Sequence, residues 1–234
     1  MEWNSERYRG HTSLCEIDLP GQKRIASATV AVVGAGGLGS AALIYLAAAG
    51  VGTLRIIDPD IVSESNLQRQ VIHSTADLGR LKADSAADTV SSLNPDVKVE
   101  SYPERLTAEN APRLLDGVTV MLDCTDNFAG RMLLDDMSGR LGIPYVYGAV
   151  SRFSGHVFTR IGDSAGFRRI FGSEQTEPDC DCAANGVLNT LVGTVGTLQA
   201  TEALKVIAGT GDPLVNRLLV IDLLTMEFST LRLG

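Results

Sequence analysis

The sequence predicts an α/β protein of the Rossmann-like class, in which a mostly parallel sheet is continued by antiparallel strands and helices lie on both faces. Apolar segments typical of buried strands alternate with helical segments over residues 29–149. A glycine-rich turn joins the first of these strands to the first helix, and the chain ends in two strand-like segments with no helix between them. The alternation is typical of parallel strands joined by helical crossovers, whereas the last two segments suggest an antiparallel pair.

The strands expected in the first half are short, apolar and bounded by turn residues; they span 29–33, 53–57, 97–101, 118–123 and 144–149. The helices expected between them span 38–49, 78–93, 108–115 and 128–141. The first of these helices is ended by Gly50, a residue type that commonly follows helices. The second stops before Asn94-Pro95, because the residue before a proline disfavours the helical conformation.

The ends of the chain and its second half have a different pattern. Residues 1–22 are polar and predict a short helix or arm. After residue 150 we expect a strand at 155–161, a polar crossover loop at 161–182, a long apolar helix at 185–208, and closing strands at 218–222 and 227–233. We expect one domain over residues 1–234, with a first half at about 1–150 and a second at about 151–234.

The composition excludes several classes of protein. Of the 234 residues, 44% are hydrophobic and only 5% aromatic, so aliphatic side chains are expected to fill the interior. The net charge of −8 is opposite to the field that a general nucleic-acid scaffold needs. The four cysteines form no C-x-x-C pair and suggest no disulfide framework. The most apolar segment, 187–208, carries amide and charged side chains, so we expect no membrane span and a cytoplasmic protein.

The glycine-rich turn has the pattern Gly34-x-Gly36-x-x-Gly39 and lies between an apolar strand and a helix. Glycines let the backbone approach a phosphate or ribose, and the N-terminus of the helix favours negative charge. A tight turn without a ligand is the alternative. Asp58 ends the second strand, where a carboxylate can accept hydrogen bonds from ribose hydroxyls. Together the two features predict a nucleotide site.

Polar side chains that follow Asp58 predict phosphate chemistry rather than hydride transfer. Asn66, Arg69 and Gln70 lie close together in the sequence, and Lys82 lies near the start of the next helix. A phosphate needs donors from several directions, and arginine supplies a planar fork of them. Such a set has no role in an NAD-dependent oxidoreductase, which the glycine turn alone would allow.

Carboxylates follow the fourth strand as well. Asp123 and Asp126 flank Cys124 there, and ligands of open α/β sheets bind outside the carboxyl ends of strands. Mg²⁺ prefers oxygen ligands and substrate phosphates, so a carboxylate at this place predicts a magnesium site. The alternative for Asp126 is a cap of the helix that begins near Phe128. Cys124, at the end of an apolar strand, is expected to be a small packed residue.

These motifs make the chain resemble the MoeB/ThiF/HesA branch of the ubiquitin-activating-enzyme superfamily. The resemblance is carried by Gly34–Gly39, Asp58, Ser65-Asn66-Leu67-Gln68-Arg69-Gln70, Lys82 and Leu122-Asp123-Cys124-Thr125-Asp126-Asn127, and it runs over nearly the whole chain. It implies an enzyme that uses ATP and Mg²⁺ to adenylylate a carboxylate, usually the C-terminal glycine of a ubiquitin-like sulfur-carrier protein. It also implies a homodimer with the long helix near the interface, a nucleotide-binding first half and a substrate-binding second half.

Carried over to this sequence, the resemblance gives each motif a role. Asp58 is expected to bind the ribose, Asn66, Arg69 and Lys82 the phosphates, and Asp126 the Mg²⁺. Arg69, Lys82 and Asp126 are the main catalytic candidates. The full set expected to bind nucleotide is Gly34, Gly36, Gly37, Gly39, Asp58, Asp60, Asn66, Arg69, Gln70, Lys82, Asp126 and Asn127. A small-molecule carboxylate in cofactor or peptide biosynthesis is the alternative substrate, and a non-catalytic ATP-binding protein is the alternative to an enzyme.

The chain also departs from the family pattern. Gly10 stands where the family commonly has an arginine that reaches the ATP of the partner subunit, so Arg9 becomes the candidate for that role, with Arg7 close by. Many members hold a structural zinc with two C-x-x-C pairs, but four such ligands are not present here, so we expect no zinc site. Cys182, in the crossover loop, is a candidate for a thioester or persulfide, and a bystander thiol is its alternative.

Overall fold

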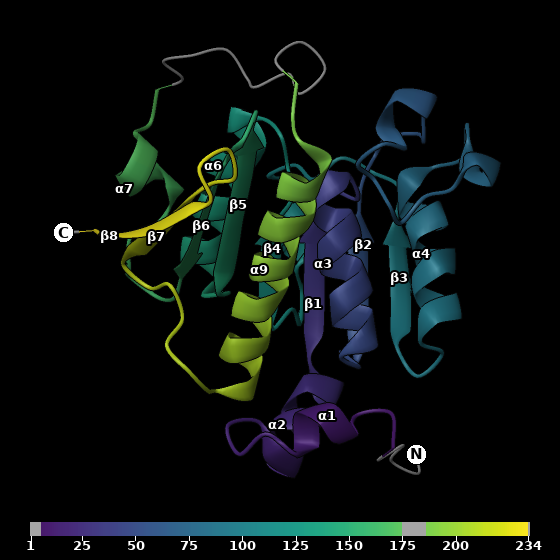
Figure 1. The fold of residues 1–234 in the computed structure, drawn as a ribbon, viewed down its shortest axis with the longest axis horizontal. Helices are drawn as coiled ribbons and strands as arrows, with labels where there is room; N and C mark the ends of the chain where they lie inside the picture. Colours follow the sequence, from purple (N-terminus) through teal and green to yellow (C-terminus); the bar gives the residue numbers. More distant parts are fainter. Residues whose placement is uncertain (1–5, 175–185, 234) are drawn as a thin grey trace.

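The computed structural model describes residues 6–174 and 186–233. These residues fold into one continuous sheet that is covered by helices on both faces (Figure 1). The sheet has eight strands in the order β3-β2-β1-β4-β5-β6-β7-β8. Their bounds are β1 Thr29–Val33, β2 Thr53–Ile57, β3 Lys98–Tyr102, β4 Val120–Asp123, β5 Tyr145–Ser151, β6 Ser154–Arg160, β7 Arg217–Asp222 and β8 Glu227–Arg232. The first five strands are parallel, and β6, β7 and β8 extend the sheet in antiparallel pairs. The predicted fold class is confirmed.

Helices cover the sheet because the central strands are apolar on both faces. Along β1, Val30 and Val32 belong to one hydrophobic cluster, whereas Ala31 and Val33 belong to the other, as the alternation of side chains in a strand requires. The first cluster packs against α3 (Gly37–Ala48), α4 (Lys82–Leu93) and α9 (Asn189–Ala208), and the second against α5 (Ala111–Leu114), α6 (Phe128–Leu141) and α7 (Phe167–Phe171).

The long helix α9 packs directly on α3, in front of the sheet in Figure 1. A Cβ at Gly196 of α9 would collide with the backbone oxygen of Leu38, so a glycine is required at this close approach. Two short helices, α1 (Arg9–Thr12) and α2 (Asp18–Ser27), lie at the lower end of the molecule in the same view. Within the described residues, no helix combines the length and the apolar character that crossing a bilayer requires.

Several predicted helix boundaries are wrong for local reasons. The helix expected at 78–93 begins at Lys82, because Gly79 has a positive φ of 81° and a 3-10 turn, η2 (Thr75–Asp77), precedes it. The helix expected at 108–115 is reduced to α5, because the Thr107 N–H donates to Asn110 Oδ1 and closes a turn there. The loop expected at 161–182 contains α7, and the helix expected from 185 begins at Asn189.

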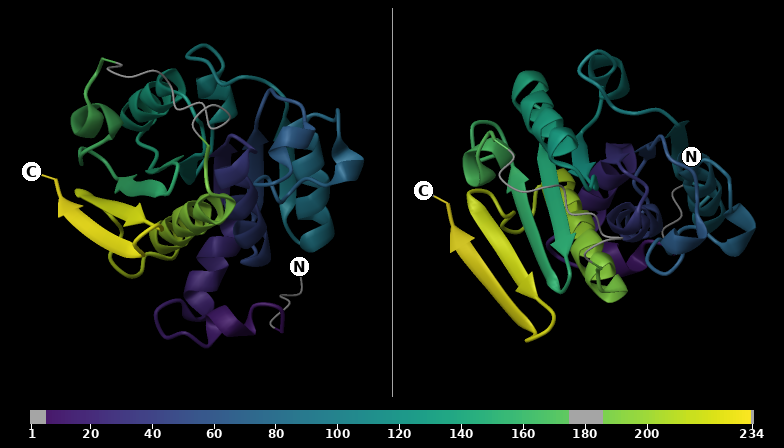
Figure 2. Two further views of the ribbon diagram at one scale, coloured as in Figure 1. Left: turned by 45° about the horizontal axis from the view of Figure 1, so that its top comes forward. Right: turned by 90° about the horizontal axis from the view of Figure 1, so that it is seen from above.

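The topology determines where a ligand can bind. The chain runs from β1 outward to β2 and β3, then returns to β4 on the other side of β1 and continues outward to β5. Such a reversal opens a crevice outside the carboxyl ends of the strands. The view from above in Figure 2 looks onto this end of the sheet, where the loops after β1, β2 and β4 meet.

Candidate active site

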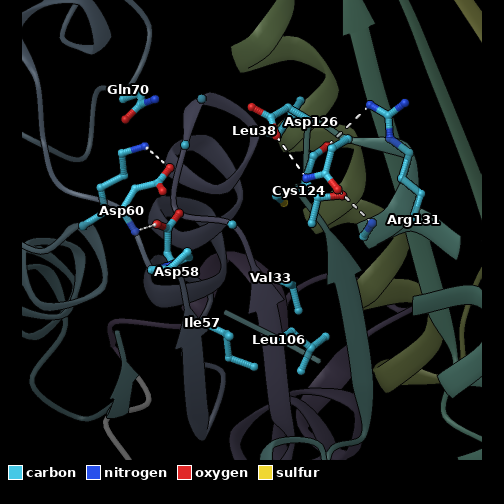
Figure 3. A pocket seen from close by; sticks show the side chains of 18 of the residues that line it. Val33, Leu38, Ile57, Asp58, Asp60, Gln70, Leu106, Cys124, Asp126 and Arg131 are labelled. Carbon is cyan, nitrogen blue, oxygen red and sulfur yellow. Dashed lines mark hydrogen bonds and ion pairs between the residues drawn. The ribbon is translucent and has the colours of Figure 1, made fainter. Parts of the chain in front are cut away.

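A cavity of about 310 Å³ opens at this reversal point, outside the carboxyl ends of β1, β2 and β4. In the close view, Asp58 and Asp60 lie on one side, and Asp126 and Arg131 lie on the opposite side (Figure 3). Val33 and Ile57, at the ends of their strands, lie toward the floor, and Gln70 lies near the rim. The cavity therefore joins the motif after β2 to the motif after β4.

The glycine loop between β1 and α3 forms one wall. Gly34 has a φ of 99°, and a Cβ there would lie 2.5 Å from the backbone oxygen of Cys124. A Cβ at Gly39 would collide with the backbone oxygen of Gly34, and one at Gly37 with the side chain of Val192. Gly36 and Gly37 line the cavity where α3 begins, and the first N–H groups of a helix have no acceptors within it. The wall is therefore a narrow backbone cradle suited to an anion.

Asp58 lies at the floor of the same wall and is only 4% exposed. The Ala35 N–H donates to its Oδ2 (2.7 Å), and the Asp60 N–H donates to its Oδ1 (2.8 Å). Burial raises the pKa of Asp58 above its usual value, and these two hydrogen bonds and nearby Lys82 oppose the rise. Each oxygen can accept a further hydrogen bond, so a fixed acceptor borders the cavity.

Lys82 is the first residue of α4 and is 7% exposed. Its Nζ lies 3.1 Å from Asp60 Oδ2, and its backbone N–H donates to the Asp60 carbonyl oxygen (2.8 Å). A buried ammonium at the N-terminus of a helix faces both a desolvation cost and the positive end of the helix dipole. Its nearby carboxylates are Asp60, whose side chain is 58% exposed, and the buried Asp58. Lys82 therefore borders the cavity as a buried cation held by two aspartates.

The structure separates the three polar residues that follow in the sequence. Arg69 and Gln70 line the cavity, and the Arg69 Nη1 donates to the Ser65 carbonyl oxygen (3.0 Å). Asn66 does not line it; it belongs to a 3-10 turn, η1 (Glu64–Asn66), in which the Ser63 N–H donates to Asn66 Oδ1 (3.4 Å). Gln70 is 4% exposed, and its Oε1 finds no hydrogen-bond partner within the part of the chain that the structure describes. Buried polar atoms usually have a partner, so Gln70 Oε1 is an acceptor available to water or to a ligand in the cavity.

The opposite wall follows β4. Asn127 caps α6, because its Oδ1 accepts from the Gly130 N–H (2.9 Å), so the cap is Asn127 and not Asp126. The Asp126 carboxylate is left at the exposed rim of the cavity, where the Asn127 Nδ2 donates to it (3.3 Å). Asp123 is fully buried and accepts from the hydroxyls of Thr125 (2.6 Å) and Tyr145 (2.7 Å). Asp123 therefore supports the wall, and Asp126 is the carboxylate available to a ligand.

An arginine that our sequence analysis did not select also lines this wall. Arg131 lies on α6, with its guanidinium 5.7 Å from the ring centroid of Tyr147 and its Nη2 donating weakly to the Thr125 carbonyl oxygen (3.5 Å). It lies on the side of the cavity opposite Asp58 and Asp60 (Figure 3). Its spacing of one helical turn from the cap Asn127 places it at this end of α6, which is a signal that the sequence does carry. Arg105, in the loop after β3, also lines the cavity and follows no motif.

The ThiF family matches this chain over residues 8–234. The chain belongs to the ThiF family. It is 46% identical over 227 residues to the SAMP-activating enzyme E1 of Haloferax volcanii, which covers 96% of this chain and 84% of that protein. It is 42% identical over 241 residues to the sulfur carrier protein adenylyltransferase of Thermus thermophilus, covering 99% of this chain and 89% of that protein.

Other comparisons agree with this family. The chain is 44% identical over 232 residues to the probable adenylyltransferase/sulfurtransferase MoeZ of Mycobacterium tuberculosis; the match covers 96% of this chain and spans 59% of that protein. The crystal structure of PaaA matches the fold with a TM-score of 0.82 at 24% identity, covering 100% of this chain and 74% of that chain. The predicted branch of the superfamily and the predicted enzyme class, an adenylyltransferase, are confirmed.

Four residues expected from the sequence to bind nucleotide or take part in catalysis are not found in the cavity lining: Arg9, Gly39, Asn66 and Cys182. Arg9 lies on α1, which Figure 1 places at the end of the sheet opposite the carboxyl ends of the strands. Cys182 falls outside the described residues. Cys124, by contrast, borders the cavity but is buried. Its thiol donates to Gln199 Oε1 (3.7 Å), and burial raises its pKa well above the usual value, as expected for a packed residue. Asn66, as described above, lies beside the cavity rather than in its lining.

Proposed function

We propose that this ThiF-family adenylyltransferase uses ATP and Mg²⁺ to adenylylate the C-terminal carboxylate of a ubiquitin-like sulfur-carrier protein. The observation that carries the proposal is one cavity with a glycine cradle and the buried cation Lys82 on one wall and Asp126 and Arg131 on the other. Two relatives whose lengths this chain largely covers are named for activating SAMP or a sulfur carrier protein.

ATP fits the first wall residue by residue. Asp58 accepts from the ribose hydroxyls, and the unsatisfied Gln70 Oε1 accepts a further donor of the nucleoside. The glycine loop and the start of α3 face the phosphates, as the dipole of the helix favours. Lys82 and Arg69 supply the positive charge. Asn66, which precedes both in the sequence, stays a predicted phosphate ligand.

Mg²⁺ fits the second wall. A magnesium ion is commonly held by one or two carboxylates together with substrate phosphates and water, so a single exposed Asp126 at the rim is a suitable protein ligand. Among the described residues no group of three or more His, Cys, Asp or Glu side chains could hold a metal ion without help from a substrate. When bound, Mg²⁺ would neutralise negative charge on the phosphates.

The residues present are suited to positioning and charge neutralisation rather than to covalent catalysis. The carboxylate oxygen of the acyl substrate attacks the α-phosphorus, the bond to the bridging oxygen of the β-phosphate breaks, and pyrophosphate leaves. Two anions must approach one another, so the barrier depends on fixed positive charge around them. Lys82 and Arg69 neutralise the departing pyrophosphate, and Arg131 attracts the incoming carboxylate from the opposite wall.

The role of Arg131 can be tested by substitution. We expect Arg131→Met to raise KM for the acyl substrate about tenfold or more while KM for ATP changes less than about threefold, because a charge-assisted hydrogen bond contributes roughly 1.5–3 kcal/mol. Arg131→Lys, which keeps the charge but not the fork, should have an intermediate effect. Arg140→Met, on the exposed end of the same helix, is the matched control. Equal KM values for the acyl substrate in wild type and Arg131→Met would exclude the assignment.

ATP–pyrophosphate exchange with Mg²⁺ tests the proposed function itself. The panel contains ubiquitin-like sulfur carriers with a free C-terminal glycine, the same carriers with the last residue removed, and small carboxylic acids. We expect exchange that depends on one intact carrier and falls at least a hundredfold in Asp126→Ala. Exchange with a small acid alone would establish the alternative substrate, and tight ATP binding without any exchange would indicate a non-catalytic protein.

A homodimer belongs to the same proposal. Arg9 lies at the far end of the sheet from the cavity of its own chain, so it could approach ATP only in a second copy. The division into a nucleotide-binding half at 1–150 and a substrate-binding half at 151–234 also stays a proposal. It is supported by the residues after β1 and β2, which form the ATP wall, and by Val187 and Val192, which line the cavity from the second half.

A further inference from the structure

A buried histidine outside the cavity lining holds the glycine loop from behind. His73 is 6% exposed. Its Nε2 lies 3.0 Å from the Ala35 carbonyl oxygen, and its Nδ1 lies 2.8 Å from Ser85 Oγ on α4. A carbonyl oxygen only accepts, so Nε2 carries a proton and donates to Ala35. Burial lowers the pKa of His73, which favours the neutral ring, so Nδ1 accepts from the Ser85 hydroxyl.

Ala35 is thereby held on both sides of its Cα atom. Its N–H donates to Asp58, and its carbonyl accepts from His73. The residues on either side are Gly34 and Gly36, whose backbones are the least restricted of all residue types. The Ala35 side chain is fully buried in the core, and these two hydrogen bonds fix the orientation of the peptide groups on either side of it. Asp58 is itself predicted to bind the ribose. His73 is therefore the partner of Ala35 that is not expected to contact the nucleotide.

His73 also connects the loop to the helix that carries the buried cation. Ser85 lies one turn after Lys82 in α4. The His73 N–H donates to the Gln70 carbonyl oxygen (3.0 Å), so its backbone is fixed to the segment that lines the rim. The imidazole therefore joins the glycine cradle to α4, and the backbone of the same residue is bonded to the Gln70 segment; these three elements form the wall assigned to ATP.

We propose that His73 is a positioning residue that fixes the Ala35 peptide, and with it the glycine cradle, in the conformation that binds the nucleotide. The proposal rests on the proposed function, because the nucleotide is taken to be ATP. It concerns a residue that touches neither substrate, since His73 does not line the cavity. A buried histidine that only fills space is the competing explanation.

Two substitutions of His73 test the contacts of Nε2 and Nδ1 separately. Glutamine places its amide at about the reach of Nε2, so His73→Gln can still donate to Ala35. Asparagine reaches only about as far as Nδ1, so His73→Asn can meet Ser85 but not Ala35. Ser85→Ala keeps the Ala35 contact and removes only the hydroxyl that orients the ring. Thermal unfolding of all three variants identifies those that fold like the wild type.

The readouts are KM for ATP and kcat in ATP–pyrophosphate exchange, and hydrogen–deuterium exchange of the peptide that covers residues 33–38 without nucleotide. We expect His73→Asn to raise KM for ATP about tenfold with kcat changed less than about threefold, because the cradle binds ATP in the ground state and the transition state alike. Amide exchange in 33–38 should accelerate in His73→Asn. His73→Gln should stay within about threefold of wild type in KM, and Ser85→Ala should lie between the two.

Other outcomes overturn the proposal. A space-filling histidine predicts a smaller active fraction, which lowers kcat and leaves KM for ATP unchanged, with Gln and Asn equally harmful. If His73→Asn does not fold, a wild-type KM in Ser85→Ala together with a tenfold rise in His73→Gln also contradicts the proposal. If the wild type shows no exchange with any substrate, the proposed function fails, but amide exchange of 33–38 in the variants still decides the role of His73.

Discussion

Lys82→Met is expected to lower kcat/KM in ATP–pyrophosphate exchange by about 10²–10³-fold. Loss of one preorganised charge or donor at a reacting centre typically costs this much. The Lys82 side chain is already buried at the N-terminus of α4 before ATP binds. It therefore needs no rearrangement when negative charge develops on the leaving pyrophosphate. The methionine side chain keeps most of the volume of lysine, so packing should change little.

The matched control is Lys98→Met. Lys98 lies at the start of β3, its side chain is 68% exposed, and it pairs with Glu100 at 2.7 Å, away from the cavity. Exposed ion pairs contribute little, so both exchange and stability should stay close to wild type. If Lys82→Met exchanged at the wild-type rate, Lys82 would be a structural partner of Asp60, and the phosphate-binding wall would have to be reassigned to Arg69 and Arg105.

The fold could be predicted because the signals that determine it are local and repeated. Apolar runs such as Thr29–Val33 and Thr53–Ile57 are bounded by glycine or by polar residues, and the structure places β1 and β2 at those residues. Helix starts were less predictable because they depend on single contacts. Thr107 closes a turn on Asn110 where the periodicity favours a helix, and the positive φ of Gly79 delays α4 until Lys82.

The candidate site also contains residues that the sequence predicts and residues that it does not. Asp58 and the glycine loop follow strand ends, and every parallel strand of such a sheet ends at the same edge, so sequence position alone brings them together. His73 could not be selected, because its partners Ala35 and Ser85 are separated from it in the sequence by 38 and 12 residues. Arg131 lies one helical turn after the cap Asn127, but a lone arginine on a helix is usually solvated, so this spacing alone did not select it; the packing of α6 places it at the cavity.

Gly34→Ala is expected to destabilise the fold, whereas Gly36→Ala is expected to leave stability almost unchanged and to weaken ATP binding. At Gly34 the φ of 99° and the Cys124 carbonyl oxygen, 2.5 Å from a Cβ, both oppose a side chain. A left-handed backbone costs roughly 1–2 kcal/mol and overpacking roughly 1–3 kcal/mol, so Gly34→Ala should lower the free energy of unfolding by about 2–5 kcal/mol. Urea denaturation of the nucleotide-free protein measures this change.

Gly36→Ala should leave the free energy of unfolding within about 1 kcal/mol of wild type, since the nearest atom to its Cβ would be Gln70 Nε2 at an ordinary 3.6 Å. Its methyl group would instead occupy the cradle that the phosphates need, so ATP binding should weaken at least tenfold in isothermal titration. The pair separates the two reasons for a glycine in this loop: Gly34 is required by the fold, and Gly36 is required by the ligand. If Gly36→Ala bound ATP as tightly as the wild type, the phosphates would not lie against this part of the loop.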